Sequence, residues 1–123
     1  MEGFNTSEWV RIIRRNLRHT TMKEPVYTPK EVTLHLKTLP DWGRRGLTLG
    51  RTFRFAGFPD SIEFVKRVAR AAEKSNHHPD IDIRFNKVTL TLTTHDAGGI
   101  TGKDFALARL CDAAGAKVGA RNS

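Results

Sequence analysis

Two short segments in which apolar and polar side chains alternate strictly constrain the fold of this chain more than any other feature. The segments are Ile81–Phe85 and Val88–Thr93, and residues 86–87 stand between them. Alternation with a period of two is typical of strands that bury one face, and a two-residue connection predicts a β-hairpin. Helical patterns flank this hairpin at residues 59–76 and 101–114. Because strands and helices do not alternate one by one, we expect an α+β fold whose antiparallel sheet is covered on one face.

Local patterns predict three further elements before the long helix. Thr28 followed by Pro29 is a typical helix start, and Pro40 ends this first helix. Residues 42–50 are rich in glycine and arginine and predict a first strand with a turn, whereas residues 51–55 alternate and predict a second strand.

Both long helices carry an apolar stripe. In the helix opened by Pro59, the stripe follows helical spacing and consists of Ile62, Val65, Val68, Ala69 and Ala72, with Phe64 beside it. In the last helix, Thr101 and Asp104 predict a capping box. The apolar side of that helix holds Phe105, Ala108, Cys111 and Ala114. We expect the chain after Gly115 to be frayed.

Composition and charge exclude several classes of protein. The chain has 123 residues, enough for one domain, and no apolar run approaches the roughly 20 residues of a membrane span. Its 21 basic and 13 acidic residues give a net charge of +8, but the basic residues are scattered and do not interleave with aromatics, so nucleic-acid binding is disfavoured. The single cysteine, Cys111, excludes an intramolecular disulfide and is expected to be a buried, inert thiol. These features favour a cytoplasmic protein that does not bind membranes.

The first 22 residues differ from the remainder. Trp9, Ile12, Ile13 and Leu17 recur at helical spacing among arginines, which predicts a basic amphipathic helix. We therefore divide the chain into a basic extension over residues 1–28, helical or disordered, a domain over 29–116 and a tail over 117–123. The role of the extension stays open, organellar targeting included.

The region from Glu73 to Asp104 concentrates the groups that suit acid/base chemistry. It contains His77, His78 and His95, and imidazole titrates near working pH. Neighbouring histidines lack the spacing of a zinc site, so we expect no metal. Structural explanations remain open for single residues: either of the paired histidines as a helix C-terminal cation, and Asp104 as a capping carboxylate. The glycines at 98–99 suit a loop that needs positive φ, or they would let the backbone approach a flat ligand closely.

The same region reads E-x-x-x-H-H-P-x(5)-F-x(9)-H-x(8)-D. This pattern resembles the signature of the pterin-4a-carbinolamine dehydratases, and the similarity extends from about Glu31 to about Ala114. The chain departs from the family at Ile81, where many relatives have tryptophan, and at Asn76, where some have aspartate.

The resemblance implies a fold, an activity and a site. The fold would be a four-stranded antiparallel sheet with about three helices on one face, assembled into homodimers or homotetramers. The activity would be that of a hydro-lyase, which removes water from 4a-hydroxytetrahydropterin to give the quinonoid dihydropterin in tetrahydrobiopterin recycling, without a cofactor. An aromatic amino-acid hydroxylase would be the pathway partner.

By the same resemblance, His77 and His95 would be the acid/base pair, and Glu73 would orient His77. The substrate-binding residues would be His78, Glu73, Asn76, Pro79, Thr93 and Thr94, with Phe85 and Asp104 in supporting positions. The alternative is a non-catalytic binding module of the same fold, like a dimerisation cofactor of a transcription factor or a Rubisco assembly chaperone. Such a module would not need the three histidines.

Overall fold

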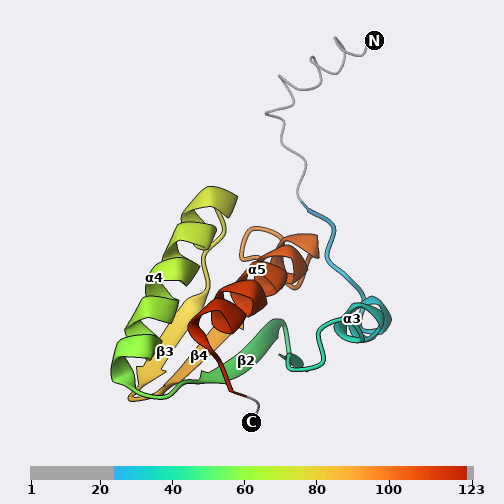
Figure 1. Ribbon diagram of the computed structural model, residues 1–123. Helices are drawn as coiled ribbons and strands as arrows, with labels where there is room; N and C mark the ends of the chain where they lie inside the picture. Colours follow the sequence, from blue (N-terminus) through green and yellow to red (C-terminus); the bar gives the residue numbers. More distant parts are fainter. Residues whose placement is uncertain (1–23, 122–123) are drawn as a thin grey trace.

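The computed structural model describes residues 24–121, so the basic helix expected within residues 1–22 lies outside the described residues. The described part contains three helices and four strands (Figure 1). In chain order they are α3 (Pro29–Leu36), β1 (Gly43–Arg45), β2 (Thr48–Arg54), α4 (Phe58–Ser75), β3 (Asp80–Arg84), β4 (Lys87–Leu92) and α5 (Gly102–Val118).

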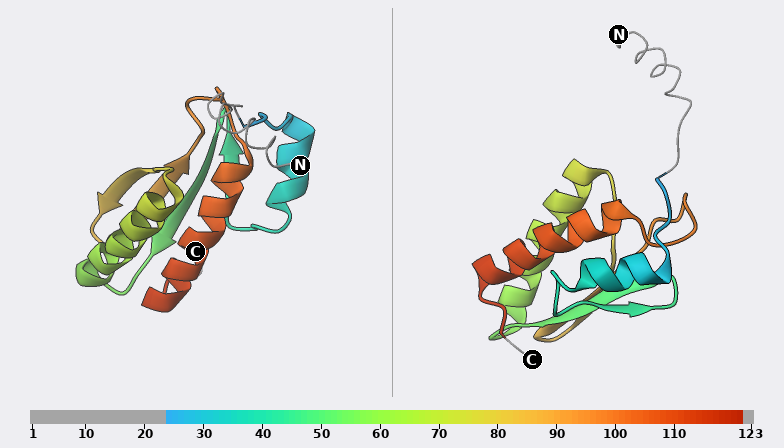
Figure 2. Two further views of the ribbon diagram at one scale, coloured as in Figure 1. Left: turned by 90° about the horizontal axis from the view of Figure 1, so that it is seen from above. Right: turned by 90° about the vertical axis from the view of Figure 1, so that its right-hand side faces the viewer.

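The four strands form one antiparallel sheet in the order β1-β2-β4-β3. Figure 2 shows α4 and α5 over one face of this sheet, with α3 beside α5 near β2. The expected α+β fold with a four-stranded antiparallel sheet is therefore confirmed. The opposite face of the sheet carries no helix from the described residues.

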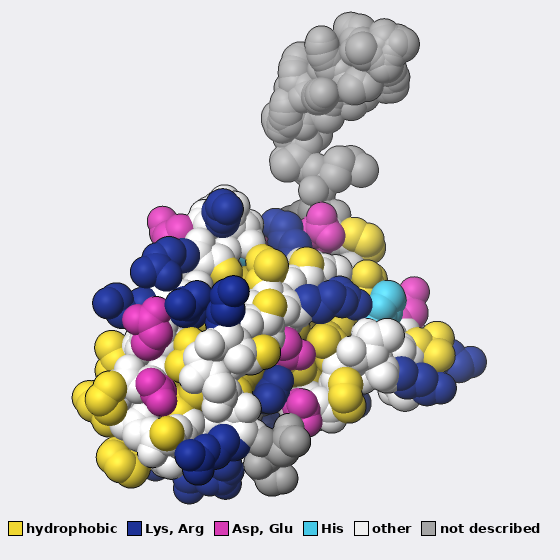
Figure 3. All heavy atoms as spheres, viewed as in Figure 1, with side chains coloured by type: hydrophobic (Ala, Val, Ile, Leu, Met, Phe, Trp, Pro, Cys, Tyr) yellow, Lys and Arg dark blue, Asp and Glu magenta, His cyan; other side chains and the backbone are white. Residues whose placement is uncertain are grey.

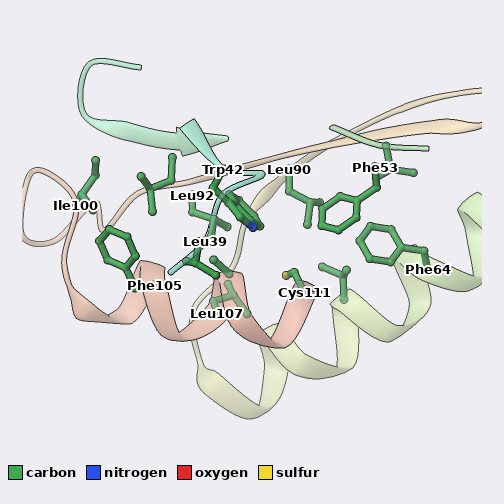
Figure 4. Packing of buried hydrophobic residues seen from close by; sticks show 14 of the residues in the cluster. Leu39, Trp42, Phe53, Phe64, Leu90, Leu92, Ile100, Phe105, Leu107 and Cys111 are labelled. Carbon is green, nitrogen blue, oxygen red and sulfur yellow. The ribbon is translucent and has the colours of Figure 1, made fainter. Parts of the chain in front are cut away.

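The core lies between the sheet and the two long helices (Figure 4). Strand alternation points Val88, Leu90 and Leu92 of β4 toward the helices, and all three are fully buried. The rings of Phe53 and Phe55 pack against Phe64 of α4 at centroid distances of 4.5 and 5.0 Å. Aromatic side chains bury large apolar areas, so this cluster stabilises the contact between sheet and helix.

The buried face of α4 differs from the predicted stripe. Its buried residues are Ser61, Phe64, Val68 and Ala72, whereas Ala69 is exposed and Ile62 and Val65 are half-buried. The largest apolar side chain of the helix, Phe64, faces the aromatic core. The residues at 62, 65 and 69 are therefore turned toward the margins of the buried face.

The hairpin is confirmed, but its turn lies one residue earlier than predicted. Arg84 pairs with Lys87, so Phe85 and Asn86 form the turn, and Phe85 adopts a positive φ of 53°. Asn86 donates its amide to the carbonyl of Phe55 at 3.0 Å, a long-range contact that holds the turn in this register and leaves no signal in the local sequence.

The expectation of a frayed chain after Gly115 was wrong for the residues up to Arg121. Helix α5 continues to Val118, past residue 116 where we placed the domain limit, and Gly119 ends it with a φ of 94°. The N–H of Arg121 then donates to the carbonyl of Arg54 at 2.8 Å. At the other end, the N–H of Tyr27 donates to the carbonyl of Ile100 at 2.8 Å, so the folded body begins within the segment assigned to the extension.

Cys111 lies fully buried on α5, as predicted. Burial raises the pKa of its thiol to about 12, with a further contribution from the negative charge of Asp112. A thiol in this environment stays protonated and unreactive at neutral pH.

Charged side chains are dispersed over the face of the molecule that Figure 3 shows. Figure 3 shows lysines and arginines interspersed with acidic residues on the face seen in Figure 1. Within residues 24–121, no helix is long and apolar enough to cross a membrane.

Candidate active site

The histidine pair stands directly after the end of α4, and the way this helix ends determines where each ring points. Asn76 caps the helix in the left-handed conformation, with φ 50° and ψ 43°, and the N–H of His77 donates to the carbonyl of Ala72 at 3.1 Å. This is a common way to end a helix, and it takes the following residues out of the helical register.

The change of register decides which carboxylate meets which histidine. We expected Glu73 to orient His77 across one helical turn, but this was wrong. Because His77 no longer follows the helix, Nε2 of the next residue, His78, lies 2.6 Å from Oε2 of Glu73 instead. Both side chains of this second pair are exposed, at 55% and 78%.

His77 meets a buried carboxylate from another element. Its Nε2 lies 2.6 Å from Oδ1 of Asp104, and the two side chains are only 11% and 0% exposed. Asp104 stands in the first turn of α5 and completes a capping box with Thr101, whose N–H donates to Oδ2 at 2.9 Å. The residue therefore caps the helix, as its local pattern predicts, and also contacts the candidate acid.

His95 lies in a tight loop that begins beyond the end of β4. Thr94 and Gly99 close this loop through a backbone bridge, and Gly98 takes a φ of 81°. The preceding residue, Thr94, directs its hydroxyl to Oδ2 of Asp104 at 2.9 Å. His95 itself is exposed. Thr94, the residue before it, and His77 are bonded to the same carboxylate, that of Asp104.

Gly99 is not explained by positive φ. A Cβ at this position would lie 2.9 Å from Cγ1 of Val26, so close packing against the segment before α3 is the reason for this glycine.

The remaining candidate residues are not all brought together. Pro79 follows the histidine pair and precedes β3. Thr93 directs its hydroxyl to the carbonyl of Leu47 at 2.7 Å. Phe85 stands at the hairpin turn, at the opposite end of β3 from the histidines, and is 68% exposed.

Sequence reasoning missed one part of the site, the contact between Thr94 and Thr101. Their hydroxyl oxygens are 2.8 Å apart and buried. Within residues 24–121, no group of three or more His, Cys, Asp or Glu side chains is arranged to hold a metal ion.

Comparison with known proteins gives a consistent assignment. The family model described as pterin 4 alpha carbinolamine dehydratase matches residues 25–114. A protein of Chloroflexus aurantiacus, provisionally named pterin-4-alpha-carbinolamine dehydratase, is 53% identical over 88 residues, which cover 72% of this chain and 95% of that protein. A protein of Nocardia farcinica with the same provisional name is 48% identical over 91 residues, or 74% of this chain and 96% of that protein.

Solved structures are similar as well. The crystal structure of a transcriptional coactivator/pterin dehydratase from Brucella melitensis superposes with a TM-score of 0.71 at 32% identity and covers 73% of this chain and 98% of that one. A pterin dehydratase-like protein identified as a RuBisCO assembly factor in the alpha-carboxysome shares the fold, with a TM-score of 0.51 at 23% identity, over 60% of this chain and 86% of that one. The chain belongs to the pterin 4 alpha carbinolamine dehydratase family.

Proposed function

We propose that this protein is a hydro-lyase that dehydrates 4a-hydroxytetrahydropterin to the quinonoid dihydropterin. The observation that carries the proposal is the pairing of His77 with the buried carboxylate of Asp104. This pairing fixes one imidazole next to the exposed His78, and Asp104 also accepts a hydrogen bond from Thr94, the residue before His95. Membership of the family and its named relatives support the same activity.

The reaction requires two proton transfers, which suit imidazole near neutral pH. The 4a-hydroxyl leaves as water and must receive a proton, and the proton on N5 must be lost. We assign these transfers to His77 and His95. His78, whose ring is exposed and held by Glu73, is assigned to binding and orienting the pterin.

A dehydration assay with purified protein tests the proposal. We expect wild-type protein to accelerate loss of water from a 4a-hydroxytetrahydropterin, and His77→Ala and His95→Ala each to lower kcat. General acid catalysis contributes typically about 10²–10⁴-fold, so the double variant His77→Ala/His95→Ala should reduce the reaction to the uncatalysed background. His78→Ala should mainly raise KM. A folded double variant that keeps more than about a tenth of the wild-type rate would contradict the assignment.

The same chemistry needs no metal, since both steps are proton transfers. Dialysis against a chelator should leave kcat unchanged, and loss of activity that returns with zinc would contradict the assignment.

For the biological setting, we propose a cytoplasmic enzyme of tetrahydrobiopterin recycling that consumes the carbinolamine made by an aromatic amino-acid hydroxylase.

We also propose that the protein assembles into a homodimer or homotetramer. Ile81 and Ile83 on the outer strand β3 are 37% and 38% exposed, and Phe85 in the turn that follows is 68% exposed. An apolar sheet edge of this kind favours association. Light scattering after size-exclusion chromatography measures the mass of the particle in solution, and a monomer at micromolar concentration would contradict the proposed oligomer.

The alternative is a non-catalytic binding module, which the shared fold with a RuBisCO assembly factor brings into consideration. A wild-type protein that is folded and inactive on carbinolamine substrates would favour it.

A further inference from the structure

The hydroxyls of Thr94 and Thr101 form a chain of hydrogen bonds that leads to His77. The N–H of Lys103 donates to Oγ1 of Thr101 at 3.2 Å, Oγ1 of Thr101 lies 2.8 Å from Oγ1 of Thr94, and Oγ1 of Thr94 donates to Asp104 at 2.9 Å. Asp104 then meets His77. In Figure 1 the end of α4 and the start of α5 lie at the same end of the molecule.

The donor and the acceptor can be assigned for each hydrogen bond in this chain. An ionised carboxylate only accepts hydrogen bonds, so Thr94 must donate to Oδ2 of Asp104. With its proton used there, Thr94 accepts at its oxygen from the hydroxyl of Thr101, which in turn accepts from the N–H of Lys103. The negative charge of Asp104 also lies in the first turn of α5, where the N–H groups of a helix favour an anion.

The same argument assigns the tautomer of His77. Oδ1 of Asp104 accepts, so Nε2 of His77 carries a proton in both the neutral and the charged ring. Within the part of the chain that the structure describes, no hydrogen bond reaches Nδ1. With Nε2 bonded to Asp104, Nδ1 is the ring nitrogen left to exchange a proton with a substrate.

We propose that Thr94 and Thr101 are positioning residues: they hold Asp104 so that His77 keeps its proton on Nε2 and offers Nδ1 for catalysis. The proposal rests on the proposed dehydratase function for its catalytic part. Thr94 is only 5% exposed and Thr101 is fully buried, so both act through Asp104 and not by contact with the pterin. Since His95 is the next residue after Thr94, the same bonds hold the loop of His95 close to His77.

A substitution series at Thr94 tests the positioning role. Valine has the shape of threonine without the hydroxyl, whereas serine keeps the hydroxyl. Loss of one hydrogen bond to a charged group behind a catalytic side chain should lower kcat about tenfold in Thr94→Val, with KM within about twofold. Thr94→Ser should recover kcat to within about threefold of wild type. Thr91→Val is the matched control, because Thr91 lies on β4, three residues before Thr94, on the face of the sheet that carries no helix, and this variant should keep wild-type kcat.

The ring nitrogens of His77 supply a readout that does not depend on activity. In ¹⁵N-labelled wild-type protein at alkaline pH, NMR should show the neutral ring with its proton on Nε2, and in Thr94→Val a mixture of the two tautomers. The signals are assigned by their loss in His77→Ala.

The two failures are distinguishable. A wild-type ring protonated on Nδ1, or an unchanged kcat in folded Thr94→Val, would overturn the positioning role. An inactive wild type with the expected tautomer would instead contradict the dehydratase function. The spectrum of the wild-type protein decides the tautomer even if Thr94→Val does not fold.

Discussion

At the scale of single residues, the site contains two histidine–carboxylate pairs with the same N–O distance but very different burial. Both measure 2.6 Å, but Asp104 is fully buried and accepts three hydrogen bonds. The side chain of Glu73 is 78% exposed and, among residues 24–121, bonds to His78 alone. Burial makes an unsatisfied polar group costly, and solvent screens an exposed pair. The two carboxylates should therefore differ strongly in their effect on stability.

Asp104→Asn should lower the free energy of unfolding by about 2–4 kcal/mol, because an amide presents donor hydrogens to buried donors. The matched exposed change, Glu73→Gln, should alter it by less than about 1 kcal/mol. Urea denaturation followed by circular dichroism measures both. Equal losses in the two variants would contradict the difference in burial.

At the scale of elements, the end of α4 determines the geometry of the site. The left-handed conformation of Asn76 places His77 toward α5 and His78 back toward Glu73. A residue other than Gly, Asn or Asp is strained there, by roughly 1–2 kcal/mol. The backbone of Asn76 thus has a structural task that is separate from any contact of its side chain with the pterin.

Substitutions at Asn76 separate these two tasks. Asn76→Gly should keep the free energy of unfolding within about 0.5 kcal/mol, whereas Asn76→Val should lower it by about 1–2 kcal/mol. Lys74→Val, two residues earlier on the exposed surface of the last helical turn, should change the free energy of unfolding by only about 0.3 kcal/mol. If the side chain also binds the pterin, Asn76→Gly raises KM while stability is kept. A stable Asn76→Val would show that the left-handed cap is not needed.

Elements were predictable from the sequence wherever periodicity was strong. The hairpin, the capping box at Thr101 and the helix start at Thr28 all follow from patterns of a few residues. The partner of His77 was not predictable, because it depends on the backbone of Asn76 and on a contact 27 residues along the chain. Local spacing pointed to Glu73, and the helix ended before that spacing could apply.

At the scale of the whole molecule, the folded body starts earlier than the sequence suggested. Tyr27 stacks on His35 at a centroid distance of 4.7 Å and on Phe105 at 5.7 Å, and its N–H bonds to Ile100. These contacts attach the segment before α3 to the start of α5, close to the residues that hold the candidate site.

Two shortened chains test where the body begins. A chain that starts at Met22 keeps Tyr27 and should retain wild-type kcat and a free energy of unfolding within about 0.5 kcal/mol of wild type. A chain that starts at Thr28 loses the stacking and the hydrogen bond and should be less stable by about 2 kcal/mol. Thermal and urea denaturation measure both chains. A large loss of kcat in the first chain, with a native circular dichroism spectrum, would assign a catalytic role to the extension.

The buried thiol makes stability depend on alkaline pH. The pKa of Cys111 is raised from 9.0 to about 12 in the folded protein, so above pH 9 the unfolded chain loses a proton that the folded chain keeps. Rising pH therefore favours unfolding, by up to about 1.4 kcal/mol per pH unit across this window. Wild-type protein should lose stability more steeply than Cys111→Ala above pH 9, with a constant difference below it. Parallel curves up to pH 11 would contradict this linkage.

The position of Cys111 also has a practical consequence for measuring motion in the native state. It is the only cysteine in the sequence, and no part of it is accessible in the folded core. An alkylating reagent can modify it only when the core opens. At low reagent concentration the labelling rate gives the population of the open form, and at high concentration it gives the opening rate itself. The unmodified protein thus carries its own probe of core opening, without an engineered reporter.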